Sequence, residues 1–301
     1  MSNGKDQPEL GPPETKGSQA SFLTQCIVLT KRSIQARGLM LVFVSSIMTF
    51  MTIGGFPSFV EEMKEGFNGR AFNLQVFDRE RLNGHYGVGA FVISNAISSI
   101  PYLFLVAVVP CSIAYFLAGL HGGATHFIYF VLVLFVCMLL VEGLMMIVAS
   151  FVPDFFMGIV IGAGIQGMMM LNNGIFQPAR YLPKPFWKYP MYYIAFHNYA
   201  TQGLFKNEFL GLTFPNSPDA AGAPPITGKE VLGSMWEVET GHSKWVDLGI
   251  LIGMAFLYRF MFLAILKLTE KAKPLMRALF ALCHKKMIHV TEQPSAPAPG
   301  N

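Results

Sequence analysis

Residues 82–141 decide the fold, and their sequence is LNGHYGVGAFVISNAISSIPYLFLVAVVPCSIAYFLAGLHGGATHFIYFVLVLFVCMLLV. This stretch contains no Asp, Glu, Lys or Arg. It is long enough for two helices of about 20 residues each across a hydrocarbon layer about 30 Å thick. Its apolar residues run continuously and do not alternate with a period of two, which favours helices over membrane strands. The stretch therefore predicts two membrane-spanning helices.

The rest of the chain has the same apolar character. Of its 301 residues, 52% are hydrophobic and 13% are charged, whereas an ordinary soluble domain has about 25% charged residues. We therefore expect an all-α membrane protein, a bundle of about five transmembrane helices. The apolar segments place these spans at residues 38–60, 91–119, 127–150, 155–176 and 247–268.

Polar segments flank this transmembrane domain, which we place at residues 38–268. Residues 1–20 are rich in Pro and Gly and have no apolar core of a signal peptide, so they predict a disordered tail. Residues 21–37 have an apolar half and a basic end, which is typical of an amphipathic helix lying in the membrane interface. Residues 177–246 are expected to form a long outer loop, and residues 269–301 a cytosolic tail.

The distribution of Lys and Arg predicts the orientation in the membrane. Four basic residues lie in residues 61–81 and six lie at or after the end of the last span, whereas the short loops between the middle spans have none. We therefore expect the 61–81 segment and the C-terminus in the cytosol. Five spans then put the N-terminus outside, although Lys31, Arg32 and Arg37 favour the inside. This end of the chain presents a conflict.

Seven blocks of sequence, spread over residues 21–267, carry a further signal: GGFPSFVEEMK (54–64), VFDRERLNGHYGVGAFVISN (76–95), SSIPYL (98–103), AYFLAGLHGGATHF (114–127), VEGLMMIVASFVPDFFMGIVIGAGIQG (141–167), PKPFWKYPMYYIAFH (183–197) and SKWVDL (243–248). Together they resemble the transmembrane domain of the white–brown-complex, or G-type, ABC transporters. The resemblance is nearest to the plant half-size members associated with export of cuticular lipids. It implies an ABC-2-type bundle, normally of six spans, in the plasma membrane.

The sequence departs from that family in three ways. It contains no GxxxxGK[ST] phosphate loop, so we expect this chain to bind neither ATP nor Mg²⁺ and to need an ATPase supplied elsewhere. Compared with the family pattern, the first of the six spans is expected to be deleted between Ser33 and Ile34, which accounts for the conflict in orientation. Residues 65–75 interrupt a place where the family sequence is continuous. These departures indicate a variant transcript or an imperfect gene model.

Two functions stay open on this basis. The first is the membrane part of an ATP-driven exporter of lipidic or hydrophobic compounds, acting as a homodimer or heterodimer with a half-size ABC transporter. The alternative is a non-transporting subunit that dimerises with complete half-transporters and modulates them. A membrane lipid enzyme is not expected, since we attribute the HxxxxH pair His121/His126 and the HxxxxD pair His242/Asp247 to chance spacing. Membrane lipids are expected partners and nucleic acids are not.

The resemblance also assigns roles to individual residues. A substrate cavity between two copies of the bundle is implied for Phe50, Ala163 and Met170. An apolar outer gate is implied for Ile175 and Phe176, and coupling to the ATPase for Arg79, Glu80 and Arg81. Without the resemblance, a Met-rich run such as 168–170 is ordinarily core or lipid-facing, although a polarisable lining suits lipid-like substrates.

Two ionisable residues fall inside predicted spans. Glu142 in the third span costs a few kcal/mol or more unless it is paired. Arg259 in the last span is either its partner or extends toward the headgroups. A hydrogen bond that packs helices together and a functional role are both compatible with this placement.

The four cysteines, Cys26, Cys111, Cys137 and Cys283, lie far apart and show no CxxC or metal-type spacing. Two of them lie inside predicted spans. We therefore expect buried apolar thiols and no metal or redox centre.

Overall fold

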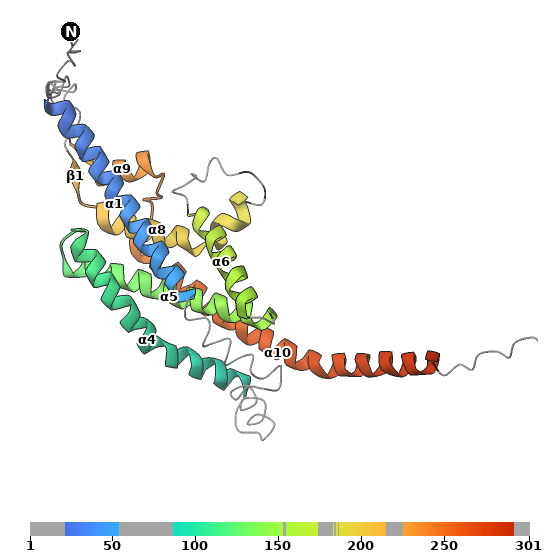
Figure 1. Ribbon diagram of the computed structural model, residues 1–301. Coiled ribbons are helices and arrows are strands. Elements are labelled where there is room, and N and C mark those ends of the chain that lie inside the picture. The colour runs from blue at the N-terminus through green and yellow to red at the C-terminus, as the bar shows by residue number, and fades with distance from the viewer. Residues whose placement is uncertain are drawn as a thin grey trace, which may run out of the picture.

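The computed structural model describes residues 22–53, 87–152, 155–173, 183, 185, 187–214 and 225–291, with side chains described between residues 28 and 269. Helices make up nearly all of this part of the chain (Figure 1). They are α1 (Phe22–Ile53), α4 (Val88–Leu117), α5 (Ala124–Phe151), α6 (Phe155–Leu171), the π-helix η2 (Trp187–Met191), α7 (Tyr192–Ile194), α8 (Phe196–Phe209), α9 (Gly228–Met235) and α10 (Lys244–Thr291). Two short strands, β1 (Thr213–Phe214) and β2 (Ile226–Thr227), pair antiparallel.

Among the described residues, four helices are long and apolar enough to cross a membrane. They are Val28–Ile53, Val88–Leu117, Ala124–Phe151 and Lys244–Thr269, and the apolar helix Phe156–Leu171 is shorter. The predicted all-α membrane fold is confirmed. The fourth expected span, residues 155–176, corresponds to the short helix α6, and residues 174–176 lie outside the described residues.

Helix α5 is the centre of the bundle. It is apolar on every side, and a helix of that kind is buried on every side. It contacts α1, α4, α6, α8 and α10. Within its most apolar window 72% of the residues are buried, against 22% in the corresponding windows of α4 and α10. Helices α4 and α10 therefore present most of their apolar surface outward, as expected for helices that face lipid.

The interfacial helix expected at residues 21–37 is not separate from the first span. Helix α1 continues through both segments without a break, from Phe22 to Ile53. A single glycine inside a helix costs only about 1 kcal/mol, so Gly38 does not end it. The position has a packing reason as well, because a Cβ on Gly38 would lie 2.6 Å from a ring carbon of Trp236. The deletion of a family span at this place stays a prediction.

The described part of residues 177–246, the region expected as the outer loop, contains helices and two short strands. Helix α8 lies within this region, and nearly all of its side chains are buried. It contacts α1, α5, α6 and α10. Further along, Thr227 and Glu230 form a capping box that starts α9, with the Glu230 amide 3.3 Å from the Thr227 hydroxyl. This short helix leads to Trp236, whose ring stacks on Phe205 and Phe209 of α8.

The expected tail at residues 269–301 also begins as regular structure. Helix α10 continues from the bundle to Thr291 and projects away from it (Figure 1). The other end of the bundle collects the start of α1, the turn between α4 and α5, helices α8 and α9, and the strands. Residues 22–37 of α1 therefore lie at the same end of the bundle as the turn near His121.

Candidate functional site

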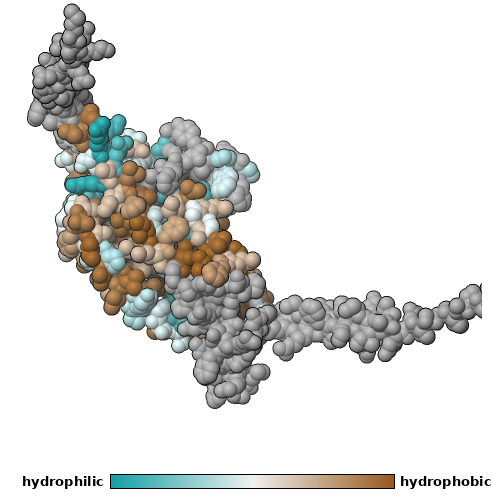
Figure 2. Space-filling view, in the orientation of Figure 1, coloured by the Kyte–Doolittle hydropathy of each residue, from teal (hydrophilic) through white to brown (hydrophobic). Residues whose placement is uncertain are grey.

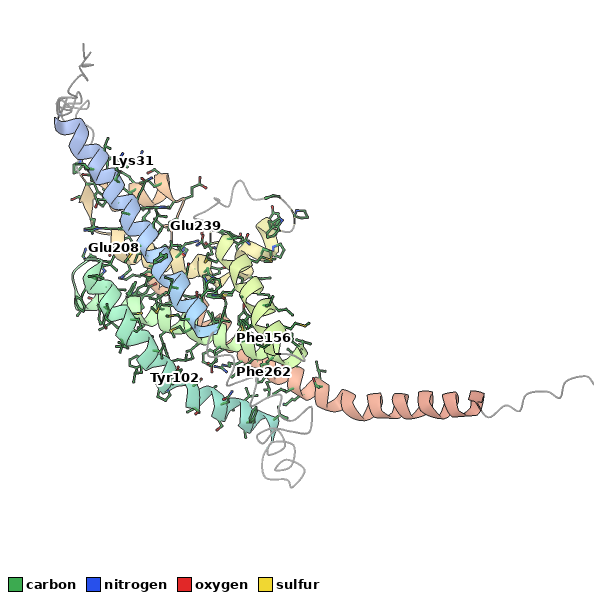
Figure 3. The ribbon with its side chains drawn as sticks, in the orientation of Figure 1. Lys31, Tyr102, Phe156, Glu208, Glu239 and Phe262 are labelled. Atoms are coloured by element: carbon green, nitrogen blue, oxygen red, sulfur yellow. The ribbon has the colours of Figure 1, made fainter. Side chains whose placement is uncertain are left out.

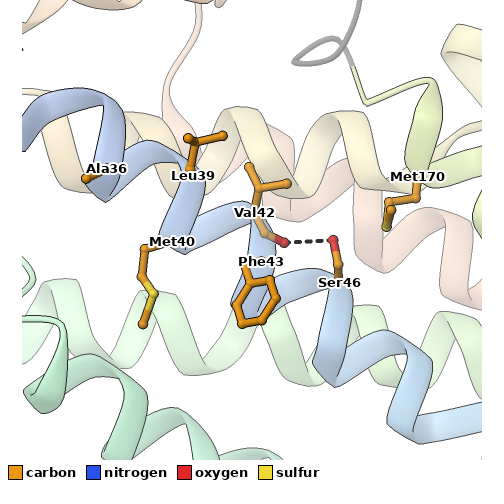
Figure 4. A pocket seen from close by; sticks show the side chains of 7 residues that line it. All are labelled: Ala36, Leu39, Met40, Val42, Phe43, Ser46 and Met170. Carbon is orange, nitrogen blue, oxygen red and sulfur yellow. Dashed lines mark hydrogen bonds between the residues drawn. The ribbon is translucent and has the colours of Figure 1, made fainter. Parts of the chain in front are cut away.

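An apolar groove of about 440 Å³ opens between α1 and α6 (Figure 4). Six of its lining residues come from α1 and one from α6: Ala36, Leu39, Met40, Val42, Phe43, Ser46 and Met170. Ser46 brings the only side-chain hydroxyl among them, and this hydroxyl donates to the Val42 carbonyl at 2.7 Å. The groove therefore presents hydrocarbon, two methionine sulfurs and one aromatic ring, and its lining side chains offer no free hydrogen-bond donor.

The three residues assigned to a cavity lie at different distances from this groove. Met170 lines it. Phe50 lies one helical turn beyond Ser46 on α1 and is 37% exposed. Ala163 is half-buried and packs against the main hydrophobic core. The groove itself uses residues of α1 that the sequence did not single out, since an apolar position in a membrane helix looks the same whether it faces lipid, core or ligand.

Apolar side chains on both helices stay exposed beside the groove. On α1 they include Leu39, Phe43, Ile47 and Phe50, and on α6 they include Val160, Met168 and Leu171. Figure 2 shows hydrophobic residues gathered over this face of the bundle. We call this surface, together with the groove, the α1–α6 seam. Exposed apolar residues alone suit a lipid-facing helix, and the seam adds a groove to them.

Glu142 and Arg259 form an ion pair between α5 and α10. The Ser99 hydroxyl of α4 also donates to Glu142 at 3.1 Å, and a second Arg259 nitrogen lies 2.7 Å from the Met146 sulfur. Of the two alternatives left open for Arg259, the structure shows the partner of Glu142. The arrangement links α4, α5 and α10. Both charges lose most of their hydration in the apolar bundle, so each needs a partner there.

A second set of charges lies where α8 meets the start of α10. Lys206 Nζ donates to Asp247 Oδ2 at 2.8 Å, and both side chains are 0% exposed. His242 Nε2 lies 2.7 Å from the other oxygen of Asp247. Asp247 is in the first turn of α10 and Lys206 in the last turn of α8, so each charge also complements the dipole of its own helix.

Glu208 extends this set toward α1 (Figure 3). Its carboxylate accepts from the His121 backbone N–H at 2.8 Å and from Arg37 at 3.3 Å. Burial raises the pKa of the Glu208 carboxyl, while the His121 N–H and the Arg37 charge act to lower it. Arg37 of the basic flank is therefore compensated by Glu208 at this end of the bundle. We call Arg37, Lys206, Glu208, His242 and Asp247 the end cluster.

The two histidine patterns have structural partners. His242 and Asp247 contact each other, and Lys206 pairs with the same carboxylate. The His121 and His126 rings stack with centroids 4.2 Å apart. No group of three or more His, Cys, Asp or Glu in the described part of the chain is arranged to hold a metal ion. Cys111 and Cys137 are free and buried.

Five assigned residues lie outside the described residues. They are the coupling residues Arg79, Glu80 and Arg81 and the gate residues Ile175 and Phe176. The same holds for the interruption at residues 65–75.

Comparison with known proteins places this bundle in a family. Residues 18–209 match the family model described as ABC-2 type transporter. The chain is 47% identical over 304 residues to ABC transporter G family member 1 of Petunia hybrida, an alignment that covers 88% of this chain and 45% of the relative. It is 41% identical over 317 residues to ABC transporter G family member 11 of Arabidopsis thaliana, covering 93% of this chain and 43% of the relative.

The chain thus spans less than half the length of these relatives. The family match includes α1, α4, α5, α6 and α8, and so takes in both the groove and the Lys206 and Glu208 part of the end cluster. The resemblance found in the sequence blocks is confirmed, and this chain belongs to the ABC-2 type transporter family, with plant G family ABC transporters as its relatives.

Proposed function

We propose that this chain is the membrane-spanning part of an exporter of lipidic or hydrophobic compounds, and that a partner supplies the ATPase. The observation that carries the proposal is the apolar groove between α1 and α6. Its volume of about 440 Å³ falls within the range of small-molecule sites. Because its lining offers no free hydrogen-bond donor, the hydrocarbon part of a molecule is what it would recognise.

The α1–α6 seam also supports pairing with a second membrane domain. The groove is open on one side and is flanked by Phe43 of α1, which is 61% exposed. A second bundle placed against the seam would enclose the groove and bury these side chains. The partner is a second copy of this chain or a complete half-size transporter, and only the complete transporter brings an ATPase.

Free energy for export against a gradient has to come from a partner that carries an ATPase. A substrate that binds two states of a transporter with different affinity only shifts their populations. We therefore place the site of ATP and Mg²⁺ binding in the partner and the substrate path in the membrane bundle. The plasma membrane is the proposed location, with the C-terminus in the cytosol and the end cluster outside.

Co-expression with a full-length relative tests this function. The tagged chain is co-expressed with ABC transporter G family member 1 of Petunia hybrida, extracted in mild detergent and purified through its own tag. We expect the relative to co-purify, and vesicles containing both chains to take up a fluorescent lipid only when ATP is supplied. The matched control is the relative with an inactivated ATPase, which should co-purify equally and transport nothing.

Each outcome separates the alternatives. A stable complex with no ATP-dependent uptake beyond that of the relative alone would favour the non-transporting subunit. Absence of a complex, under conditions in which two copies of the relative do pair, would contradict the partner. Uptake by this chain alone would contradict an external ATPase.

A further inference from the structure

Unpartnered polar atoms gather where α1, α6 and α8 meet. In the part of the chain with described side chains, four buried side-chain nitrogen or oxygen atoms have no hydrogen-bond partner. Two of the four, Gln166 Oε1 and His197 Nδ1, belong to neighbouring side chains of α6 and α8. Gln166 is 0% exposed and His197 is 2% exposed. Leaving a buried polar group unsatisfied costs about 1–3 kcal/mol, and folded proteins keep few of them, so this concentration calls for a ligand.

His197 contacts both Thr49 of α1 and Gln166 of α6. The Thr49 hydroxyl donates within its own helix, to the carbonyls of Ser45 at 3.0 Å and Ser46 at 2.9 Å. His197 Nε2 lies 3.4 Å from the Thr49 oxygen and 3.2 Å from the Gln166 amide nitrogen. One ring nitrogen of His197 is thus engaged and the other is unpartnered.

The protonation of the His197 ring determines whether His197 Nδ1 and Gln166 need a hydrogen-bond donor or an acceptor. Burial lowers the pKa of His197 to about 4, so the ring is neutral at physiological pH, with one nitrogen that donates and one that accepts. If Nε2 accepts from the Gln166 amide, His197 Nδ1–H and Gln166 Oε1 stay unsatisfied. If the ring tautomer and the amide are both reversed, the His197 Nδ1 lone pair and the Gln166 NH₂ stay unsatisfied. Either assignment leaves one free donor and one free acceptor.

A hydroxyl group answers that requirement, because it donates one hydrogen bond and accepts others. A carboxylate accepts only and an ammonium group donates only, so each would leave one of the two atoms unsatisfied. Each of these ions would also bring an uncompensated charge among neutral side chains. The chemistry of the site therefore favours an alcohol.

Two of these side chains, Thr49 and Gln166, lie on the helices α1 and α6 that form the groove. Gln166 and Met170 are four residues apart on α6, and Ser46 and Thr49 are three apart on α1, so each pair shares one face of its helix. Met170 and Ser46 line the groove. The cluster of Thr49, Gln166 and His197 is thus one helical turn further along the α1–α6 seam. Met170 has an unbranched side chain of the kind that repacks readily around a ligand.

We propose that Thr49, Gln166 and His197 form a polar subsite that binds the hydroxyl group of an amphipathic lipid whose hydrocarbon chain lies in the groove. The subsite deepens the proposed function and rests on it, because it names the polar end of the molecules that the groove selects. It makes the seam prefer long-chain alcohols over hydrocarbons of the same length.

Binding of two matched probes tests the subsite. Radiolabelled hexadecanol and hexadecane are titrated against the purified chain in lipid nanodiscs, with bound probe counted by scintillation proximity. We expect Gln166→Leu and Thr49→Val each to reduce hexadecanol binding about fivefold to tenfold, the effect of losing a buried hydrogen bond. Hexadecane binding should change less than about twofold. Partition into the bilayer is common to all variants, so the ratio of variant to wild type isolates the site.

Thr52→Val is the matched control, because it removes a hydroxyl from the same helix that donates to the Met48 carbonyl, away from the cluster. It should leave the binding of both probes unchanged. If Gln166→Leu does not yield a monodisperse protein, Thr49→Val and His197→Phe decide the question.

The outcomes distinguish the subsite from the function on which it rests. Wild-type protein that binds neither probe overturns both proposals. Variants that lose both probes in parallel, or that keep wild-type binding of hexadecanol, overturn the subsite and leave the groove in place. A cluster that holds only water would give that last result.

Discussion

The burial of polar and apolar side chains is opposite in the end cluster and in the α1–α6 seam. In the end cluster, charged side chains such as Lys206 and Asp247 are fully buried and paired. In the seam, apolar side chains such as Phe43 and Leu39 are exposed, while polar atoms of Gln166 and His197 lie behind them without partners. The first region is complete within one chain, and the second lacks both a cover and hydrogen-bond partners.

The difference shows which interactions fix the bundle and which are reserved for other molecules. Helices in lipid gain little from burying apolar surface against each other, so polar contacts and close packing hold them together. The end cluster supplies such contacts between α1, α8, α10 and the turn near His121. The seam contributes little to that framework. Substitutions should therefore destabilise the bundle at the end cluster and alter binding at the seam.

The largest effect is expected from Asp247→Ala. It leaves the Lys206 charge buried without its carboxylate, which should lower the free energy of unfolding by about 3–5 kcal/mol. Thermal unfolding of the purified chain, followed by reaction of buried Cys111 and Cys137 with a thiol dye, measures the loss. The double variant Lys206→Met with Asp247→Leu should recover most of it, since it removes both charges. If Asp247→Ala is as stable as wild type, the end cluster does not stabilise the bundle and the contrast with the seam fails.

Glu142→Gln should have the next largest effect. It removes the carboxylate that accepts from Arg259 and Ser99, and a hydrogen bond to a charged group contributes about 1.5–3 kcal/mol. The loss is smaller than for Asp247 because Arg259 is partly exposed and its long side chain can reach toward the headgroups. The same thermal assay applies, with Ser99→Ala as the milder companion. A larger loss from Ser99→Ala than from Glu142→Gln would contradict the assigned roles.

Gly38→Ala tests the contact between α1 and Trp236, which follows α9. The new Cβ would lie 2.6 Å from the Trp236 ring. Overpacking typically costs about 1–3 kcal/mol, and the better helix propensity of alanine returns about 1 kcal/mol. We expect a net loss of about 1 kcal/mol. Gly253→Ala in α10 is the control, because its Cβ would meet nothing within 4 Å. It should be neutral or stabilising in the same unfolding measurement.

Phe50→Ala should have the smallest effect on stability. It tests the α1–α6 seam, where substitutions are expected to alter binding. Phe50 is 37% exposed, and exposed substitutions usually change stability by about 0.5 kcal/mol or less. Its loss should instead reduce the amount of a full-length relative that co-purifies. Phe256→Ala, which removes an exposed ring of α10, is the matched control and should leave co-purification unchanged. Equal effects of the two variants would mean that the seam is an ordinary lipid-facing surface.

The sequence predicts the spans well because charge is the deciding quantity there. The absence of charged residues between 82 and 141 is a local property, and it corresponds to α4 and α5. The sequence also named Glu142 and Arg259, because an ionisable residue in an apolar run stands out. It left their partnership open since they lie 117 residues apart.

Helix α8 was missed for the converse reason. It contains Lys206, Asn207 and Glu208 in succession, a pattern typical of a solvent-exposed loop. Their burial depends on partners such as Asp247 and His121, which lie 41 and 87 residues away. The groove was only partly anticipated, through Met170, because the resemblance assigned roles to single positions and not to a surface.

Helix α10 joins the span from Lys244 to Thr269 to a further stretch that ends at Thr291 as one uninterrupted helix. At about 1.5 Å per residue, that stretch of about 22 residues reaches about 33 Å beyond the span. Arg259 of α10 pairs with Glu142 of α5 and so anchors the helix within the bundle. From Arg259 to Thr291 the helix is about 48 Å long, so a tilt of about 10° at the ion pair would move its far end by about 8 Å. Small rearrangements inside the apolar bundle are thereby converted into displacements at its far end.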